Sequence, residues 1–475
     1  MNICSIEFIL YVTVAFILYW TIFSRTRRWQ NAFLLLCSMC FYAIWDWRAL
    51  GLLIITVLIT YVTGCINESG GGKKQRLWAT TLGITINIGI LGFFKYFNFF
   101  SESFVSLMKS VFHSSLSYTT LDIILPVGIS FYTFSSISYI VDTYKKDVEP
   151  TRDIVVVALY MSFFPAILSG PIHKATKQFP QYLVIRSFDS TAVIRAFRMI
   201  LWGAFMKLCI ADRLGVVVDS VYSNITAYSG VTVFLSSVLY TLQIYADFAG
   251  YSLIAIGVAL MFGIELQNNF NKPYLSKSIT EFWKKWHISL TSWFRNYVYF
   301  PLGGNRVSNA RWMINIMVVF LLSGLWHGAA ISFIIWGGVH GIIQLVEKKI
   351  FNEKIKEIEH VGGIAGLFHI LITFLIVNFA WVLFRLPFNE ATIAFKTMFT
   401  SFSGELYLGR GLTNIWITLF CLLILIIKEC VDSKSWANKL WNSSVVLRWG
   451  IYYIMAFCLM IFGNSSSESF IYYQF

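Results

Sequence analysis

A long run without Asp, Glu, Lys or Arg, from Met313 to Val346, constrains the fold more than any other part of the sequence. As one helix it would measure roughly 50 Å, well beyond the roughly 30 Å hydrocarbon core of a bilayer. The run must therefore tilt, break or form two segments. We predict that it breaks at its glycines, which are Gly324, Gly328, Gly337 and Gly338.

The same run carries the polar residues Asn315, His327 and His340. Titratable groups at membrane depth are costly unless they face a cavity, so each imidazole is a candidate functional group. A neutral imidazole is well suited to accept a proton from a hydroxyl near pH 7, which predicts a general base. The alternative for His327 is a histidine that is hydrogen-bonded to a neighbouring helix.

The composition indicates an integral membrane protein, because 57% of the residues are hydrophobic and only 13% are charged. No ten-residue alternation typical of an outer-membrane barrel is present. The net charge of +13 comes from short basic clusters between apolar runs, which argues for the positive-inside rule and against nucleic-acid binding. We expect an all-α polytopic protein with lipid around it.

The apolar runs predict about eleven membrane crossings in a single domain, 1–475. Basic loops at Arg25–Arg28 and Lys73–Arg76 follow odd-numbered spans, which places these loops in the cytoplasm and the N-terminus outside. We divide the chain into N-terminal spans (1–160), a catalytic core with a cytoplasmic funnel (161–345) and C-terminal spans (346–475). The predicted spans lie near 5–23, 31–45, 50–66, a fourth run ending near 100, 123–141, 191–210, 231–262, 313–346, 363–384, 412–427 and 446–463.

Two features are unusual for membrane-spanning helices. Pro165 and Pro171 must break any helix between Phe164 and Gln181, so this backbone is predicted to be buried in protein or to line water. Asp247 lies in the middle of an apolar span and needs a cationic partner, for which we expect an interfacial Arg or Lys.

A segment dense in Trp and Lys precedes the uncharged run. At helical spacing His287 shares an aromatic face with Trp283 and Trp286, while Lys284 lies elsewhere. The segment is therefore predicted to form an interfacial amphipathic helix, in which His287 is either functional or merely reaches the interface.

A basic patch at the same interface suits a phosphorylated ligand such as coenzyme A. A glycine-containing turn follows the patch and could cradle a phosphate. No motif for a metal site is present, and no other hydrolase or nucleotide-binding motif competes. The residues that we predict to contact the ligand are Lys284, Lys285, Arg295, Gly303, Gly304, Asn305 and Arg306.

Several longer motifs resemble the membrane-bound O-acyltransferase family. The sequence is most similar to the bacterial branch of alginate and peptidoglycan O-acetylation proteins, and more distantly similar to the teichoic acid D-alanylation acyltransferase. The motifs span most of the chain and occur in the same order. They are Gly170–Ile172, Asp247–Ser252, Asn269–Tyr274, Phe282–Leu290, Pro301–Arg306 and Leu325–Gly328.

This resemblance implies roles for three histidines in a fold of helices with re-entrant or interfacial segments. His327 matches the catalytic histidine of the family, His287 the second histidine on the cytoplasmic side, and His340 a further histidine associated with activity. The chain departs from the branch at Asn296, where Asp is frequent, and at Lys174, where Arg is more usual. Both substitutions keep hydrogen-bonding capacity, so the expected enzyme class is unaffected.

The last six residues, Phe470–Phe475, also resemble a family feature. A similar ending in the D-alanylation system lies on a small partner protein, and its tyrosine is implicated in carrying the acyl group. The resemblance therefore implies that Tyr472 accepts the acyl group at the outer face. The alternative is an aromatic anchor at the membrane interface.

The resemblance implies an O-acetyltransferase of the bacterial inner membrane that uses acetyl-CoA as donor substrate and binds no permanent cofactor. The acceptor would be an extracytoplasmic polysaccharide, reached directly or through an extracytoplasmic acetyltransferase partner. Transfer of D-alanyl or another acyl group is an alternative. A transporter or a non-catalytic scaffold of acyl donors is another, since intramembrane His and broken helices suit it equally.

Overall fold

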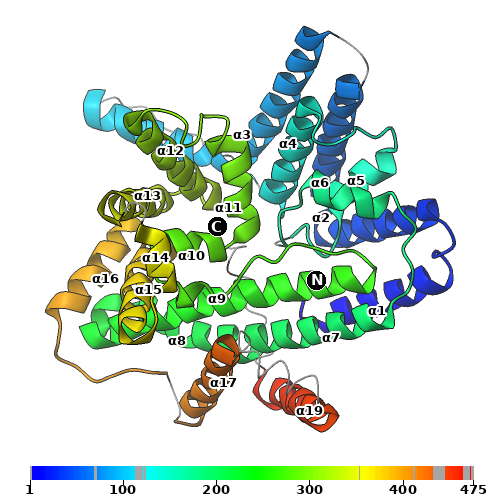
Figure 1. The fold of residues 1–475 in the computed structure, drawn as a ribbon. Coiled ribbons are helices and arrows are strands. Elements are labelled where there is room, and N and C mark those ends of the chain that lie inside the picture. The colour runs from blue at the N-terminus through cyan, green and yellow to red at the C-terminus, as the bar shows by residue number, and fades with distance from the viewer. Residues whose placement is uncertain are drawn as a thin grey trace.

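The computed structural model describes residues 3–68, 72–112, 121, 123, 125–168, 170–351, 354–409, 412–431, 444–463 and 471. Within these ranges the regular structure is helical and contains no strand, which confirms the all-α prediction. The helices surround the centre of the molecule, with α9 and α7 lying along one side and α12 and α13 along another (Figure 1).

The N-terminal helices are α1 (Ile6–Thr21), α2 (Arg27–Glu68), α3 (Lys73–Phe112), α4 (Ile129–Lys145), α5 (Ile154–Ser162) and α6 (Ala175–Tyr182). The central ones are α7 (Ser190–Ala204), the π-helix η1 (Phe205–Ala211), α8 (Asp212–Tyr222), η2 (Ile225–Ala227), α9 (Gly230–Met261), η3 (Pro273–Leu275), α10 (Ile279–Lys285), α11 (Ile288–Phe294) and the π-helix η4 (Arg295–Tyr299). The C-terminal ones are α12 (Asn309–His327), α13 (Ile331–Phe351), α14 (Ile355–His360), α15 (Gly363–Arg385), α16 (Phe388–Thr400), α17 (Leu412–Val431) and α19 (Val445–Phe462).

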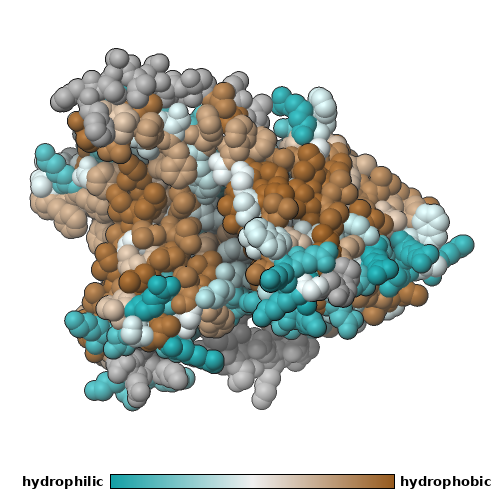
Figure 2. Space-filling model, turned by 90° about the horizontal axis from the view of Figure 1, so that it is seen from above, coloured by the Kyte–Doolittle hydropathy of each residue, from teal (hydrophilic) through white to brown (hydrophobic). Residues whose placement is uncertain are grey.

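Several helices have the length and hydropathy of a membrane crossing. In the described part of the chain, 6 helices meet this criterion, namely α2, α3, α9, α12, α15 and α19. Asp46 has non-helical backbone angles inside α2, so this helix consists of two segments, as the separate spans predicted near 31–45 and 50–66 require. Figure 2 shows hydrophobic side chains over a broad band of one face, with hydrophilic residues along its lower edge. The protein is a multi-pass membrane protein, and the total of about eleven crossings stays a prediction.

The uncharged run forms two helices, and only one of its four glycines ends a helix. Gly328 has extended backbone angles and follows the last residue of α12. Our prediction of breaks at Gly324, Gly337 and Gly338 was wrong, because these glycines lie inside helices. A Cβ atom on Gly324 would lie 2.2 Å from the carbonyl oxygen of Phe333, and one on Gly337 the same distance from that of Phe320. These two glycines are therefore required for close packing of α12 against α13.

Replacement of Gly337 by alanine is expected to destabilise the protein by about 1–3 kcal/mol, because the new methyl group meets rigid backbone. The matched control is Gly338→Ala in the same helix, where the nearest atom is a Leu321 methyl at 3.6 Å. That variant should be as stable as wild type, or more stable by up to about 1 kcal/mol, because alanine favours helix. Thermal unfolding in detergent measures both, and equal melting temperatures would contradict this account.

A buried group of ions joins η1, α8 and α9. Lys207 Nζ lies 2.6 Å from Asp247 Oδ1 and 2.7 Å from Asp212 Oδ1, and all three side chains are at most 5% exposed. The prediction of a cationic partner for Asp247 is confirmed, but the partner is a buried lysine rather than an interfacial one. Lys207 belongs to the π-helix η1, a type of helix that often marks functional or constrained positions.

The stretch between α5 and α6 is non-helical and buried, as Pro165 and Pro171 predict. Its backbone is satisfied from inside the protein. The amide of Phe164 donates to Ser38 Oγ at 3.1 Å, and that of Ile172 donates to Ser289 Oγ at 3.0 Å. The second bond ties this stretch to α11, next to His287.

Candidate active site

His327 lies at the C-terminal end of α12, where Gly328 interrupts the helix. Its side chain is 5% exposed. The rings of Trp336 and Phe384 each lie 5.1 Å from the imidazole centroid, and the ring of Trp326 lies 4.8 Å from it. His327 also interacts electrostatically with His287 and Lys95. A titratable group is thus enclosed by aromatic walls and has a second histidine nearby.

The helix α3 contributes a part of the site that was not predicted from the sequence. The last carbonyl groups of an α-helix lack partners within the helix. Here Lys95 Nζ donates to the carbonyl oxygens of Trp326 at 2.6 Å and His327 at 3.2 Å, and the Tyr96 hydroxyl donates to that of Leu325 at 2.7 Å. A cation at a helix C-terminus is also favoured by the helix dipole. Lys95 and Tyr96 therefore fix the end of α12 that carries His327. The only signal in the sequence was a lysine in an apolar run.

His287 does not lie within a helix. It has a left-handed backbone conformation, with φ of 42°, between the end of α10 and the start of α11. Our prediction of one continuous amphipathic helix was therefore wrong. The side chain is fully buried, so the alternative in which His287 reaches the membrane interface is also wrong. A non-glycine residue with positive φ is uncommon and strained, and such strain is concentrated at functional sites.

The surroundings of His287 are aromatic. The ring of Phe248 lies 4.7 Å from the imidazole centroid, and that of Trp326 lies 6.0 Å from it. Burial lowers the pKa of His287 to about 3, so this imidazole is neutral at physiological pH. Trp326 contacts both His287 and His327. The structure therefore brings these two predicted site residues together around one indole ring.

His340 lies on α13 and is separated from His327 by Trp336. The ring of Trp336 lies 5.0 Å from His340 and 5.1 Å from His327. His340 is fully buried, and neither ring nitrogen has a hydrogen-bond partner among the described residues. It also contacts the ring of Trp283 at 5.0 Å. His340 thus borders the site through aromatic rings, and its part in activity stays a prediction.

Two lysines of the predicted basic patch are engaged in ion pairs. Lys284 Nζ lies 2.6 Å from Glu359, and Lys285 Nζ lies 2.5 Å from Glu281. Arg295 is exposed at the start of η4. Lys174 interacts with it electrostatically, and burial together with the Arg295 charge lowers the pKa of Lys174. In the described part of the chain, Arg295 and Arg306 form no ion pair with a carboxylate, in contrast to Lys284 and Lys285.

The glycine-containing turn is closed by its own backbone. The amides of Gly303, Gly304 and Arg306 donate to carbonyl oxygens within the turn at 2.9–3.1 Å. Asn315 on α12 donates to the carbonyl oxygens of Leu302 and Gly304 at 3.1 and 3.2 Å, which explains this polar residue in the uncharged run. The three amides are thus occupied in this conformation. Contact with a phosphate would come from the exposed side chains of Asn305 and Arg306.

A cavity of about 180 Å³ connects the basic patch with the aromatic surroundings of the histidines. Arg295 and Lys348 line it, and so does Trp283, which contacts His340. Its other walls are mainly apolar. The lining thus combines two cationic side chains with mainly apolar ones. The remaining lining residues are Leu290, Thr291, Phe294, Tyr299, Ile316, Val319, Phe320, Ser323 and Gln344.

Of the C-terminal ending, the structure describes Ile471. This residue is 7% exposed, and its amide donates to Asp247 Oδ2 at 2.9 Å. Ile471 therefore lies inside the protein. Tyr472, the predicted acyl acceptor, lies outside the described residues.

The fold and the site define a class before any comparison is made. This is a multi-pass helical membrane protein with two neighbouring histidines buried among aromatic rings. In the described residues no group of three or more His, Cys, Asp and Glu side chains has the arrangement of a metal site.

Comparison with known proteins identifies the family. Residues 150–353 match the model of the membrane-bound O-acyltransferase family. The chain is 36% identical over 360 residues to the probable alginate O-acetylase AlgI of Azotobacter vinelandii, covering 75% of this chain and 70% of that protein. It is 34% identical over 403 residues to the peptidoglycan O-acetyltransferase of Helicobacter pylori, with coverages of 78% and 74%. It is 28% identical over 288 residues to the teichoic acid D-alanyltransferase of Bacillus subtilis, with coverages of 56% and 70%. The chain belongs to the membrane-bound O-acyltransferase family.

Proposed function

We propose that this protein is an O-acetyltransferase that takes acetyl from cytoplasmic acetyl-CoA and delivers it across the membrane to an extracytoplasmic polysaccharide. The observation that carries the proposal is the burial of His327 beside His287, in a chain whose relatives include an alginate O-acetylase and a peptidoglycan O-acetyltransferase. The protein would lie in the bacterial inner membrane with its N-terminus outside. Its basic loops support this orientation.

His327 acts as the general base in the proposed reaction. Its neutral imidazole accepts the proton of an acceptor hydroxyl, and the oxygen attacks the thioester carbonyl carbon. The carbon–sulfur bond then breaks, and the departing thiolate takes the proton from the imidazolium. This sequence leaves an oxygen ester and free CoA. His287 positions the thioester or relays the proton.

The cavity lined by Arg295 and Lys348 supports a cytoplasmic route for the donor. Its cationic residues suit the phosphates of CoA, and its apolar walls lead toward Trp283 and His340. The predicted contacts of Lys284 and Lys285 require that the donor compete with Glu359 and Glu281 for these ammonium groups. Arg295, Asn305 and Arg306 are accessible without such competition.

Release of free CoA tests the function directly. Purified protein in detergent is incubated with acetyl-CoA labelled in the acetyl group, and CoA thiol and transferred label are measured with and without a polysaccharide acceptor. We expect CoA release that depends on the protein. An extracytoplasmic acetyltransferase partner is added in a second series. No release in any arm would favour the alternative of a transporter or scaffold. Release with D-alanyl or longer acyl donors, but not with acetyl-CoA, would show that the transferred group is not acetyl.

Replacement of Tyr472 by phenylalanine is expected to abolish polymer acetylation and to leave thermal stability unchanged. The substitution removes one hydroxyl, which in this proposal is the atom that receives the acetyl group before its transfer to the polymer. Mass spectrometry of the C-terminal peptide after incubation with labelled acetyl-CoA measures the ester. Tyr473→Phe, in the same segment, is the matched control and should retain the label. Full polymer acetylation by Tyr472→Phe would exclude the relay.

A further inference from the structure

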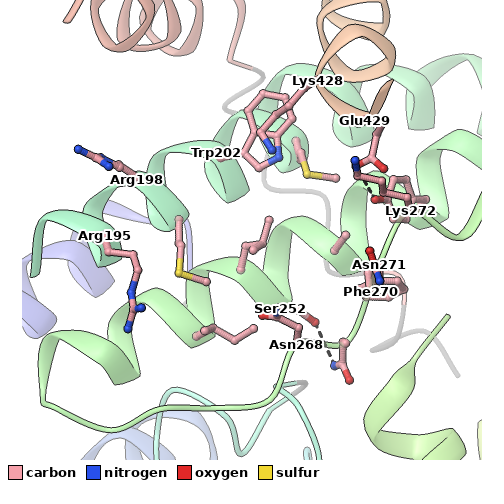
Figure 3. Close-up of a pocket in the computed structure, with 17 residues that line it drawn as sticks. Arg195, Arg198, Trp202, Ser252, Asn268, Phe270, Asn271, Lys272, Lys428 and Glu429 are labelled. Carbon is pink, nitrogen blue, oxygen red and sulfur yellow. Dashed lines mark hydrogen bonds between the residues drawn. The ribbon is translucent and has the colours of Figure 1, made fainter. Parts of the chain in front are cut away.

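A second, larger cavity lies away from the histidines. Its volume is about 380 Å³, and it is formed by α7, α9, α17 and the loop from Asn268 to Lys272 (Figure 3). None of the three candidate histidines lines it, and it shares no residue with the cavity beside Arg295. The lining residues are Arg195, Arg198, Met199, Trp202, Met206, Tyr245, Ala249, Ser252, Leu253, Ile256, Asn268, Asn269, Phe270, Asn271, Lys272, Lys428 and Glu429.

Positive charge predominates in this cavity. Four lining residues are cationic and one is a carboxylate, Glu429, which accepts a hydrogen bond from the Tyr245 hydroxyl at 2.9 Å. A second carboxylate outside the lining, Glu265, lies 2.9 Å from Arg195. Two carboxylates thus oppose four cations. The four cationic residues, which belong to three different elements (Figure 3), are Arg195, Arg198, Lys272 and Lys428.

Lys272 is the lining residue that most favours an anionic ligand for this cavity. Its Nζ atom is buried and has no hydrogen-bond partner among the described residues. Its backbone is left-handed, with φ of 51°, immediately before Pro273. A buried ammonium without a partner is costly, and so is a left-handed backbone at a non-glycine residue. An anionic group in the cavity would offset the first cost.

Part of the cavity wall is apolar. Met199, Trp202, Leu253 and Ile256 contribute hydrophobic surface beside the cations. The helices that form the cavity expose large apolar side chains elsewhere, as membrane-facing helices do. Examples are Ile194 and Phe197 on α7, and Leu423, Ile426 and Ile427 on α17. Lipid acyl chains would therefore lie against the outer faces of two helices that form the cavity.

We propose that this cavity binds an anionic phospholipid, with the phosphate-bearing headgroup against Lys272 and the arginines and the acyl chain against Met199 and Trp202. The excess of cations favours an anionic headgroup over a zwitterionic one. The apolar walls favour a lipid over a free phosphate. The site is distinct from the donor route proposed above and does not depend on it.

The bound lipid would stabilise the backbone around His287. Asn269, on the same loop, accepts hydrogen bonds through its side chain from the Ser289 hydroxyl at 2.6 Å and through its carbonyl oxygen from the amide of Ile288 at 2.9 Å. The amide of Asn271 donates to the carbonyl oxygen of Lys285 at 3.0 Å. These bonds hold both sides of the left-handed turn. Occupation of the cavity is therefore expected to support the position of His287.

Lipid titration of the full-length protein tests the proposal. Delipidated protein in detergent receives phosphatidylglycerol, phosphatidylcholine or inorganic phosphate, and native mass spectrometry and thermal unfolding measure binding. We expect saturable binding and a higher melting temperature with phosphatidylglycerol alone. Equal effects of phosphatidylcholine would overturn the preference for an anionic headgroup. Equal protection by inorganic phosphate would overturn the lipid as the source.

Two variants keep the test specific. Lys272→Met should weaken phosphatidylglycerol binding about tenfold or more, because a charged hydrogen bond is lost. Lys428→Gln removes a cation from another helix and should also weaken phosphatidylglycerol binding. This variant still tests the site if Lys272→Met fails to fold. Lys109→Met, an exposed residue at the end of α3, is the control and should bind as wild type. Wild-type affinity in both cavity variants would refute the site.

Discussion

Replacing His327 with alanine is expected to lower the rate of acetyl transfer by about 10²–10⁴-fold, the usual contribution of a general base. The reason is local. The imidazole is enclosed by Trp326, Trp336 and Phe384, and this enclosure leaves little room for bulk water to replace it as base. Binding of acetyl-CoA should change little, because the predicted donor contacts come from other elements.

The measurement is CoA release under saturating acetyl-CoA, together with donor binding by calorimetry. His369→Ala is the matched control, since this half-buried histidine lies on α15 away from the aromatic cluster, and it should retain full activity. His327→Gln keeps a hydrogen-bonding side chain of similar size and should be as inactive as alanine. Substantial activity in the glutamine variant would show that position 327 serves hydrogen bonding or packing rather than proton transfer.

Replacing Lys207 with methionine is expected to lower the free energy of unfolding by about 3–5 kcal/mol, because it leaves two buried carboxylates without their shared cation. Asp212 and Asp247 both lie within 2.7 Å of Lys207 Nζ. Asp247 also accepts the amide of Ile471, so the same change should loosen the C-terminal ending. This effect is expected to be the largest of any single substitution outside the histidine cluster.

Thermal unfolding in detergent and limited proteolysis from the C-terminus measure these two effects. Lys396→Met, an exposed lysine on α16, is the matched control and should be neutral. The triple variant Lys207→Met, Asp212→Asn and Asp247→Asn removes all three charges and should recover part of the lost stability. If the triple variant is no more stable than Lys207→Met alone, buried charge is not the cause.

The sequence was sufficient for those features that follow from a local rule. Proline predicts the non-helical stretch at Pro165 and Pro171, and burial of a carboxylate predicts a cation for Asp247. The identity of that cation was not predictable, because Lys207 lies 40 residues earlier and only the packing of η1 against α9 brings the two together. The same holds for Lys95, whose partners on α12 are 231 and 232 residues away.

Local patterns were misleading where tertiary packing overrides them. The spacing around His287 is helical, yet bonds from the Asn269 loop on both sides hold a left-handed turn there. Glycine disfavours an α-helix, yet Gly324 and Gly337 are needed inside α12 and α13 because the backbones of these two helices approach closely. Helical periodicity contains no information on the Asn269 loop or on the facing helix. The turn at His287 and the helical glycines could therefore not be predicted from the sequence.

In the donor route that we propose, the helix α12 sets a requirement on the length of the donor. Asn315 holds the turn that presents Asn305 and Arg306, and His327 ends the same helix. Twelve residues of α-helix separate these two positions by about 18 Å along the helix axis. A small activated acyl compound cannot contact both ends of that distance at once. A donor that carries its acyl group on a long flexible arm can contact both ends. The charged end of the arm is then held at the turn while the reactive carbon of the acyl group reaches the imidazole of His327.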